Sequence, residues 1–329
     1  MTSIENKVIE LTNIVPLEMA GLRLDQALAQ LFPQYSRSQL KTWLEAGFIT
    51  VDGRHDKPKE KVKGEEQIIL KAPVVPAVTW EAQAQDLNII YEDEHLIVLN
   101  KPKNCVVHPG AGNPSGTLVN ALLHHHPAAS ELPRAGIVHR LDKDTTGLMV
   151  VAKTALAYQA LVKMLQEREV KRVYEAVVCG VPVAGGTVSA PMARHPNERK
   201  KMAVVDSNHG KEAITHYRVL QKYRQHARLE MRLETGRTHQ IRVHLAYIHY
   251  PILGDKTYGG RFKMPPKASP EFQEKLRGFP RQALHAKYLS LQHPMTGETL
   301  EWQVPLPADM MDLIQALTDD LIQHVDEHD

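Results

Sequence analysis

The pattern of apolar positions divides the chain into a short first part and a long second part. In the first part, apolar residues recur every three or four positions in two stretches, which predicts two helices. Pro33 ends the first of these helices, and two strand-like runs, residues 48–54 and 65–72, follow the second. The apolar positions of the first helix are Leu24, Ala27, Leu28 and Leu31.

The second helix of this first part has its own start and stop signals. Ser36 and Gln39 have the spacing of a capping box, and Gly47 ends the helix. The strand that follows is closed by an Asp-Gly pair typical of a tight turn. The pattern therefore predicts a small N-terminal α/β domain whose second helix points inward with Leu40, Trp43 and Leu44.

From about Leu87 onward, strand-like runs dominate. Two apolar runs flank a turn-like "EDEH" in residues 87–102, which predicts a hairpin, and residues 293–302 predict another. Strands follow strands more often than they alternate with helices, which indicates an α+β fold with a mixed, largely antiparallel sheet and helices packed on it. Helices are expected at 117–125 and 155–169, and further strands at 170–178, 214–220, 227–233 and 283–291.

A stretch without clear period, residues 71–85, carries two prolines and is typical of an interdomain linker. It sets the expected domain boundaries. We expect an N-terminal segment over residues 1–17, the small domain over 18–75, a linker over 76–86, the large domain over 87–307, and an acidic C-terminal helix or tail over 308–329.

The formal net charge of +2 hides an uneven distribution. Residues 288–329 contain nine acidic residues and neither lysine nor arginine, so removing those nine charges leaves +11 for residues 1–287. A basic body favours a polyanionic partner, although solvated charged faces explain the charges equally well. The small domain concentrates cations that suit phosphate contacts: Arg23, Arg37, Lys41, Arg54, Lys57, Lys59, Lys61 and Lys63.

Other features exclude several classes of protein. No apolar run reaches the roughly 20 residues of a membrane span, and the N-terminus lacks the pattern of a secretion signal, so we expect a cytoplasmic protein. The two cysteines, Cys105 and Cys179, are far apart and argue against a disulfide framework. The histidine run 124–126 lacks metal-ligand spacing. We expect a monomer with no metal and no membrane contact.

The stretch "HRLDKDTTGL", residues 139–148, places Asp142 and Asp144 among cations, between apolar runs that both resemble buried strands. If residues 138–143 are extended, the two carboxylates share a face, roughly 6 to 7 Å apart. Such a pair suggests a glycosidase, but a glycosidase needs one protonated carboxyl, and neighbouring cations favour the ionised form. The stretch favours a carboxylate acting as anion or nucleophile, with structural ion pairing as the alternative.

A second cluster lies in "LETGRTHQIRVHL", residues 233–245. Its apolar stripe, Ile241, Leu245 and Ile248, predicts a helix from which Arg242 can reach a pocket. Arg237 and His239 are expected in the first turn, where exposed N–H groups favour anions. Because no cofactor motif accompanies these residues, they indicate a cofactor-free reaction on an anionic substrate.

Six motifs occur in the order seen in the RluA family of pseudouridine synthases, which the chain resembles over about residues 87–307. They are "VLNKPKNCVVHPG", "HRLDKDTTGL", "KRVYEAVVCG", "ETGRTHQIRVHL", "GDKTYGG" and "ALHA". The small domain, with "RLDQAL" and "SRSQLKTWLEAGFITVDG", resembles the RNA-binding domain first described in the fourth protein of the small ribosomal subunit. Together the two resemblances span nearly the whole chain.

The resemblance implies the pseudouridine synthase fold, a bent mixed sheet flanked by helices with the site in a central cleft, and no cofactor. It implies isomerisation of uridine to pseudouridine in 23S ribosomal RNA, in the hairpin loop of helix 69, with the large ribosomal subunit or its precursor as partner. A target elsewhere in ribosomal or transfer RNA, a non-catalytic RNA-binding assembly factor and a glycosidic hydrolase remain alternatives.

The resemblance also implies roles for single residues. Asp142 would attack the ribose–uracil system, and Arg242 would pair with it. Tyr174 would lie against the uracil and is the candidate for removing the carbon-5 proton; its phenol is a poor base at neutrality, unless Arg140 and Arg242 favour the phenolate. Arg140 would fill the space left by the extruded base, and Leu284 would form a wall of the uracil pocket. The further RNA-binding candidates are Arg237, His239, Arg23, Arg37 and Lys41.

Overall fold

The computed structural model of the chain describes residues 8–33, 35, 37–73, 80–110, 112–198, 200–260 and 264–325. The chain forms two compact units, Met1–Val78 and Thr79–Asp329. Within the described ranges, no helix is long and apolar enough to cross a membrane.

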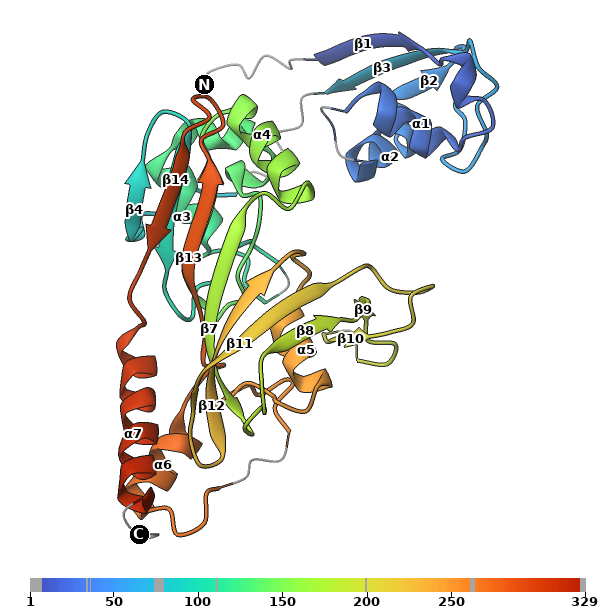
Figure 1. Cartoon of the computed structure of the whole chain (residues 1–329). Coiled ribbons are helices and arrows are strands. Elements are labelled where there is room, and N and C mark those ends of the chain that lie inside the picture. Colours follow the sequence, from blue (N-terminus) through green and yellow to red (C-terminus); the bar gives the residue numbers. More distant parts are fainter. Residues whose placement is uncertain are drawn as a thin grey trace. The chain divides into compact units, whose positions relative to one another are not determined.

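The first unit is a three-stranded antiparallel sheet with two helices packed on it (Figure 1). Its core is formed by apolar side chains of α1 and α2, among them Leu28 and Leu40, against those of β3, among them Ile68 and Leu70. The sheet has the order β1–β3–β2. The elements are β1 (Val8–Ile14), the short 3-10 turn η1 (Leu17–Met19), α1 (Leu24–Leu31), α2 (Arg37–Glu45), β2 (Ile49–Val51) and β3 (Gln67–Pro73).

This unit begins earlier than the expected residue 18. Strand β1 pairs with β3 along its whole length, from Val8 opposite Pro73 to Ile14 opposite Gln67. As an edge strand it alternates between exposed and half-buried positions, so no fully apolar face marks it in the sequence. The expected capping residue Ser36 lies outside the described residues.

The second unit is built on one nine-stranded sheet of order β4–β5–β6–β13–β7–β12–β11–β8, with β14 paired to β13. Among the described strands of this sheet, only β6 and β13 run parallel, which confirms the expected mixed, largely antiparallel sheet. Its strands are β4 (Ile89–Glu92), β5 (Leu96–Lys101), β6 (Thr146–Ala152), β7 (Lys171–Cys179), β8 (Gly186–Ser189), β11 (Ile214–Lys222), β12 (His226–Leu233), β13 (Leu284–Gln292) and β14 (Thr299–Gln303).

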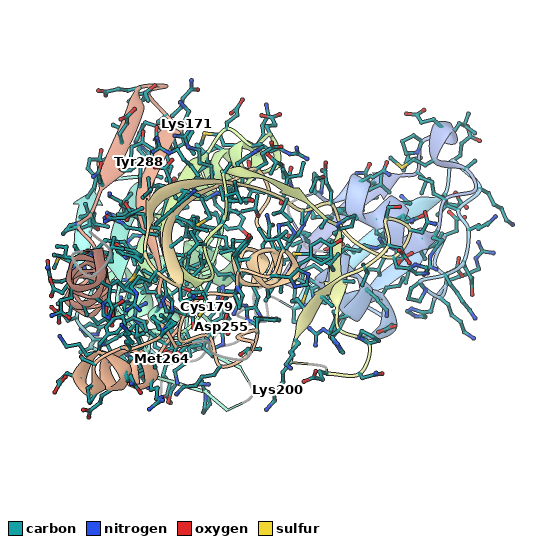
Figure 2. All side chains as sticks on the ribbon, turned by 60° about the horizontal axis from the view of Figure 1, so that its bottom comes forward. Lys171, Cys179, Lys200, Asp255, Met264 and Tyr288 are labelled. Atoms are coloured by element: carbon teal, nitrogen blue, oxygen red, sulfur yellow. The ribbon has the colours of Figure 1, made fainter. Side chains whose placement is uncertain are left out.

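Both faces of this sheet are covered, and for that reason β5 and β6 are continuous apolar runs. Ile97 and Met149 face one core with α3 and α5, while Val98 and Leu148 face another with α4. Figure 2 labels Lys171 and Tyr288, which lie on the neighbouring strands β7 and β13. The helices are α3 (Leu118–His125), α4 (Ala155–Gln166), α5 (Gln240–Tyr247), α6 (Pro270–Gly278) and α7 (Ala308–Val325); β9 (Met192–Arg194) and β10 (Met202–Val204) form a separate ribbon.

The parallel pairing of β6 with β13 depends on a glycine. At Gly147, φ is +114°, and a β-carbon there would lie 2.2 Å from the main-chain oxygen of Ala286. Only glycine permits both the backbone angle and this close approach. It lies five residues after Asp142, where it anchors the strand that follows the acidic stretch.

The C-terminal acidic segment is a docked helix. Its apolar side, including Met310, Leu313 and Leu317, belongs to the main core of the second unit. Two of its carboxylates are bound by arginines: Asp309 by Arg281 and Asp320 by Arg224. The acidity of this segment is therefore partly used in holding α7 (Ala308–Val325) against the sheet.

Candidate active site

The acidic stretch lies in a loop between a one-turn helix and strand β6. The preceding apolar run "AGIV" is not a strand: Arg134 and Ala135 have φ of +53° within the 3-10 turn η3 (Pro133–Gly136), and Ile137 makes only an isolated bridge with Val151. Asp142 then opens a turn, since its main-chain oxygen accepts from the Thr145 N–H at 3.1 Å. The expectation of an extended segment there was wrong.

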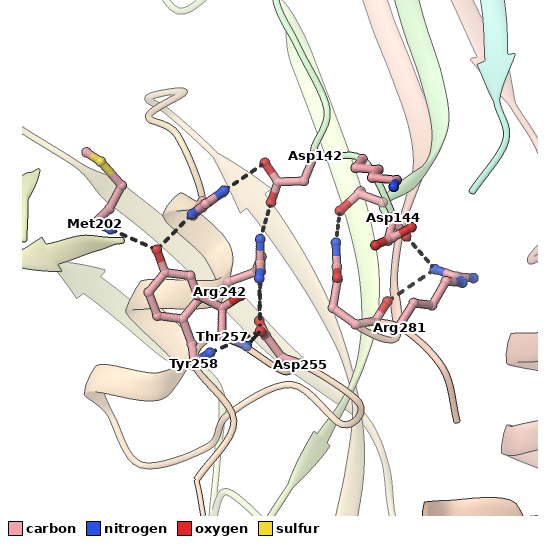
Figure 3. A network of polar contacts seen from close by, with 12 residues as sticks. Asp142, Asp144, Met202, Arg242, Asp255, Thr257, Tyr258 and Arg281 are labelled. Carbon is pink, nitrogen blue, oxygen red and sulfur yellow. Dashed lines mark hydrogen bonds and ion pairs between the residues drawn. The ribbon is translucent and has the colours of Figure 1, made fainter. Parts of the chain in front are cut away.

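Because of that turn, the two carboxylates do not form a pair of equivalent groups. The side chain of Asp144 accepts a hydrogen bond from the main-chain N–H of Asn104 at 3.2 Å. Asp142 binds Arg242 of helix α5 instead, whose Nη1 donates to its Oδ2 at 2.9 Å (Figure 3). The cation that sequence analysis placed off the apolar stripe thus holds Asp142, the residue expected to act as nucleophile.

Arg242 is itself fixed by a second carboxylate. Its Nε and Nη2 donate to the two oxygens of Asp255 at 2.7 and 2.9 Å, a bidentate pair. The main-chain N–H groups of Thr257 and Tyr258 also donate to Asp255. Burial acts to lower the pKa of Arg242, but Asp255 and Asp142 outweigh it and raise that pKa. The guanidinium is permanently charged and immobile.

His239 completes the surroundings of Asp142. It caps helix α5 with φ of +58°, and its Nε2 lies 3.7 Å from Asp142 Oδ1. Its Nδ1 contacts the Tyr258 hydroxyl at 2.7 Å, and this hydroxyl also accepts from the Met202 N–H (Figure 3). Burial is the main cause that lowers the pKa of His239, so its imidazole is neutral at neutral pH. His239 is therefore a helix cap facing Asp142 and does not lie in the first turn as expected.

Two buried cations hold the loop of Asp142 in place through hydrogen bonds to its main-chain oxygens. Lys101, fully buried at the end of β5, donates to three main-chain oxygens, including that of Lys143 at 2.9 Å. Arg281 donates through Nη1 to the main-chain oxygen of Asp144 at 3.1 Å. The residues directly after Asp142 are thus held from two sides.

Tyr174 lies in β7 between Met231 and Ala286 of the flanking strands, and only 5% of its surface is exposed. Burial raises the pKa of its phenol, and the nearby Asp142 carboxylate also raises it, while Arg172 acts in the opposite direction. The expected lowering by Arg140 and Arg242 is not found, because loss of hydration outweighs the nearby cation.

Two cavities meet at Arg140. A larger one of about 820 Å³ is lined by Tyr174, Arg237 and Arg172, and a smaller one of about 510 Å³ contains Asp142 and Arg242. Arg140 lines both and forms no hydrogen bond or ion pair with any residue that the structure describes. Its side chain is exposed where the two cavities adjoin.

The remaining predicted residues lie at different distances from this cleft. Arg237 lines the larger cavity, and its Nε donates to the main-chain oxygen of Glu212. Leu284 is 4% exposed, belongs to the core and lines neither cavity. In the separate first unit, Arg23 and Arg37 both bind the buried Asp25, while Lys41 pairs with Glu45; all three side chains remain about half exposed.

Sequence reasoning missed Asp255, Lys101 and Arg281, although Asp255 and Lys101 lie in quoted motifs and Arg281 lies two residues before "ALHA". Asp255 follows Arg242 by 13 residues across a loop, so no periodicity relates them. A lone acid in "GDKTYGG" after a helix rich in basic residues is the only signal that pointed to this pair. Among the described residues, no group of three or more His, Cys, Asp or Glu side chains is arranged to hold a metal ion.

Comparisons with known proteins agree with this geometry. A family model described as RNA pseudouridylate synthase matches residues 95–247, and an S4 domain model matches residues 22–68. Ribosomal large subunit pseudouridine synthase D of Haemophilus influenzae is 56% identical over 322 residues, which cover 98% of this chain and 99% of that protein. The Escherichia coli protein of the same name is 54% identical over 322 residues, covering 98% of each.

Solved structures show the same likeness. Human RNA Pseudouridylate Synthase Domain Containing 4 is 29% identical, with a TM-score of 0.55 over 70% of this chain and 93% of that one. Human RNA Pseudouridylate Synthase Domain Containing 1 is 25% identical, with a TM-score of 0.52 over 72% and 96%. The resemblance drawn from the motifs is thereby confirmed, and the chain belongs to the RNA pseudouridylate synthase family of isomerases.

Proposed function

We propose that this chain isomerises uridine to pseudouridine in the RNA of the large ribosomal subunit, at uridines in the hairpin loop of helix 69. The relatives that it covers almost completely are named for the large ribosomal subunit. The observation that carries the chemistry is the Asp142–Arg242–Asp255 chain, in which one carboxylate borders a cavity and the other is fully buried.

In this proposal Asp142 is the nucleophile. Asp142 attacks C1′ and the bond between C1′ and N1 breaks; the uracil rotates, and the bond to Asp142 breaks as a new bond joins C1′ to C5, which releases the free carboxylate. The proton on C5 leaves, and N1 gains one, so the reaction is an isomerisation. Arg242 pairs with the Asp142 carboxylate and holds it in place, so this step needs no cofactor.

The uridine has to leave the RNA stack to reach Asp142, which lies inside the cleft with 15% of its side chain exposed. Unstacking a loop base costs a few kcal/mol, and phosphate contacts offset it. Arg140, which is exposed at the junction of the two cavities and has no partner among the described residues, would occupy the space that the base leaves. Arg237 and His239 would contact the RNA at the same cleft.

Tyr174 supplies the flat ring against the uracil, since it lines the larger cavity from the sheet. Its hydroxyl is our candidate acceptor of the C5 proton, and its raised pKa makes this the most demanding part of the proposal. Leu284 is assigned to the apolar wall behind the ring, because β13 pairs with β7 at this point.

The first unit would hold the RNA through its cations. Arg23, Arg37 and Lys41 keep about half of their side chains exposed even though each has an acidic neighbour. Phosphate contacts from such residues add affinity and little sequence preference. The choice of uridine would then come from the cleft and the fold of the RNA loop.

The experiment is release of tritium from a helix 69 stem-loop labelled at uridine C5. The proposed isomerase releases tritium to water without freeing uracil. A glycosidic hydrolase frees uracil, and a non-catalytic RNA-binding factor does neither. A transfer RNA stem-loop labelled in the same way separates the proposed target from another target of the same family.

A further inference from the structure

One arginine beside Tyr174 has no partner in the part of the chain that the structure describes. Arg172 lies two residues before Tyr174 on β7, so both side chains leave the same face of the strand. Only 8% of Arg172 is exposed, and it lines the larger cavity together with Tyr174. Its Nε is fully buried without a hydrogen-bond partner, and its guanidinium forms no ion pair with a described residue.

This arrangement differs from that of the other buried arginines of the unit. Arg242 and Arg281 are similarly buried, and each forms a bidentate pair with a carboxylate. A buried cation without such a partner is costly, because it has lost water and gained no compensating charge. A structural role in the free protein does not account for Arg172.

The backbone opposite makes room for this guanidinium. A β-carbon at Gly236 would lie 2.8 Å from Arg172 Nη1, although φ at Gly236 lies outside the left-handed region. A larger residue at this position would therefore displace the guanidinium of Arg172, although the backbone angle does not demand glycine. Gly236 and Arg172 both line the larger cavity, so the absence of a side chain at Gly236 leaves this part of the wall to the guanidinium.

The charges around the cavity indicate the ligand. Arg168 is neutralised by Glu212 and Glu234, which line the same cavity. Arg134, like Arg172, lines it without an ion pair to any described residue. A cavity wall with unpaired guanidinium groups fits an anion that arrives with the substrate, and in RNA that anion is the phosphodiester.

We propose that Arg172 binds a phosphodiester of the RNA next to the uridine that lies against Tyr174. The inference rests on the proposed function, because it needs RNA in this cleft. Two residues along a strand separate Arg172 from Tyr174 by roughly 6 to 7 Å, which suits a base and a phosphate of adjoining parts of one strand. Arg172 then tethers the extruded nucleotide while Asp142 reacts.

The test is a double-mutant cycle on binding. Helix 69 stem-loops are made with one loop phosphodiester at a time replaced by a neutral methylphosphonate, and their affinities are measured for the full chain and for Arg172→Met. We expect one position where the replacement weakens wild-type binding about ten-fold, the loss typical of one charge-assisted hydrogen bond, and leaves Arg172→Met binding unchanged. If every replacement weakens both proteins equally, the proposal is wrong.

Three controls make the outcome specific. Lys171→Met removes one positive charge from the residue next to Arg172. Its affinity should still fall, as for the wild type, when the critical phosphodiester is replaced. Figure 2 shows Lys171 apart from Asp255 and Lys200. Gly236→Ala keeps the charge but displaces the guanidinium, and should lose the response as Arg172→Met does. The thermal unfolding midpoint of Arg172→Met should equal or exceed that of the wild type, since an unpaired buried charge is removed.

The two proposals fail separately. Absence of tritium release by the wild-type chain counts against the proposed function, while the binding cycle still decides the role of Arg172. If Arg172→Met lowers kcat without any coupling to a phosphate, Arg172 acts through Tyr174, and the phosphate assignment is overturned.

Discussion

Arg281 donates hydrogen bonds to both carboxylate oxygens of Asp309, at 2.9 and 2.8 Å, and so connects the C-terminal helix to the loop of Asp142. The same guanidinium donates to the main-chain oxygen of Asp144, two residues after Asp142. Helix α7 (Ala308–Val325) therefore takes part in positioning the loop of Asp142, the proposed nucleophile, although it begins 166 residues after Asp142 in the chain.

Asp309→Asn tests this connection. Loss of the charge weakens the ion pair with Arg281 and loosens the loop of Asp142, so we expect kcat to fall about ten-fold. KM should change little, because the proposed RNA contacts are untouched. Asp320→Asn is the matched control, since it breaks the Arg224 pair on the same helix away from the loop. If both variants lower kcat equally, α7 contributes only stability.

Asp255→Asn tests the buried support of Arg242. Asp255 has no exposed side-chain surface, and removing one partner of a buried pair costs about 3 to 5 kcal/mol of unfolding free energy. We also expect turnover to fall, because Arg242 is then free to turn away from Asp142. Urea unfolding measures the first effect, and Glu230→Gln, which breaks the surface pairs with Arg218 and Arg232, should cost less than about 1 kcal/mol.

Tyr174→Phe separates two roles of the ring. If the hydroxyl accepts the C5 proton, binding survives while product formation stalls after the glycosidic bond has broken. If the ring serves only for stacking, the Phe variant works nearly as well as the wild type, since stacking needs only the face of the ring. The experiment measures product formation and the dissociation constant for a helix 69 stem-loop, each for Tyr174→Phe and for the wild type.

We expect the buried His285 to make the free energy of unfolding depend on pH. Burial lowers the pKa of His285 to about 4, well below its unfolded value near 6.5, so the folded chain keeps this imidazole neutral. Between these values only the unfolded state gains the proton, so this contribution is fully present above pH 6.5. It is lost as the pH falls toward 4, by about 3 kcal/mol.

Unfolding free energies measured from pH 7 to pH 4 check this slope. His285→Asn should flatten it, whereas His249→Asn, a change at an exposed position with φ of +68° that Asn tolerates, should leave it unaltered. An identical slope in wild type and His285→Asn would assign the acid sensitivity to other groups.

The periodicity of apolar residues was sufficient to predict helices and strands wherever their burial pattern is regular. The apolar runs of β5 (Leu96–Lys101) and β6 (Thr146–Ala152) and the spacing in α1 (Leu24–Leu31) predicted their elements, because one or both faces of each are buried. It failed at "AGIV", where positive φ angles at Arg134 and Ala135 turn an apolar run into a helical turn. No property of those two side chains signals such angles.

The site was predictable in part for a related reason. Motif resemblance supplied Asp142 and Arg242, and the structure places them 2.9 Å apart. Asp255 and Asp309 reach their arginines only through loops and helix docking, which no local pattern encodes. The raised pKa of Tyr174 likewise follows from burial in the assembled sheet, so the sequence suggested the opposite direction.

Tritium release by Asp142→Asn tests the central claim most directly. The amide keeps the shape of the side chain but removes the anion, so RNA binding should persist while release from the C5-labelled helix 69 stem-loop becomes undetectable. Asp144→Asn, whose side chain contacts only the Asn104 N–H among the described residues, should retain most of the wild-type release. Readily measured release by Asp142→Asn, with RNA bound normally, would contradict the assignment of Asp142 as the nucleophile.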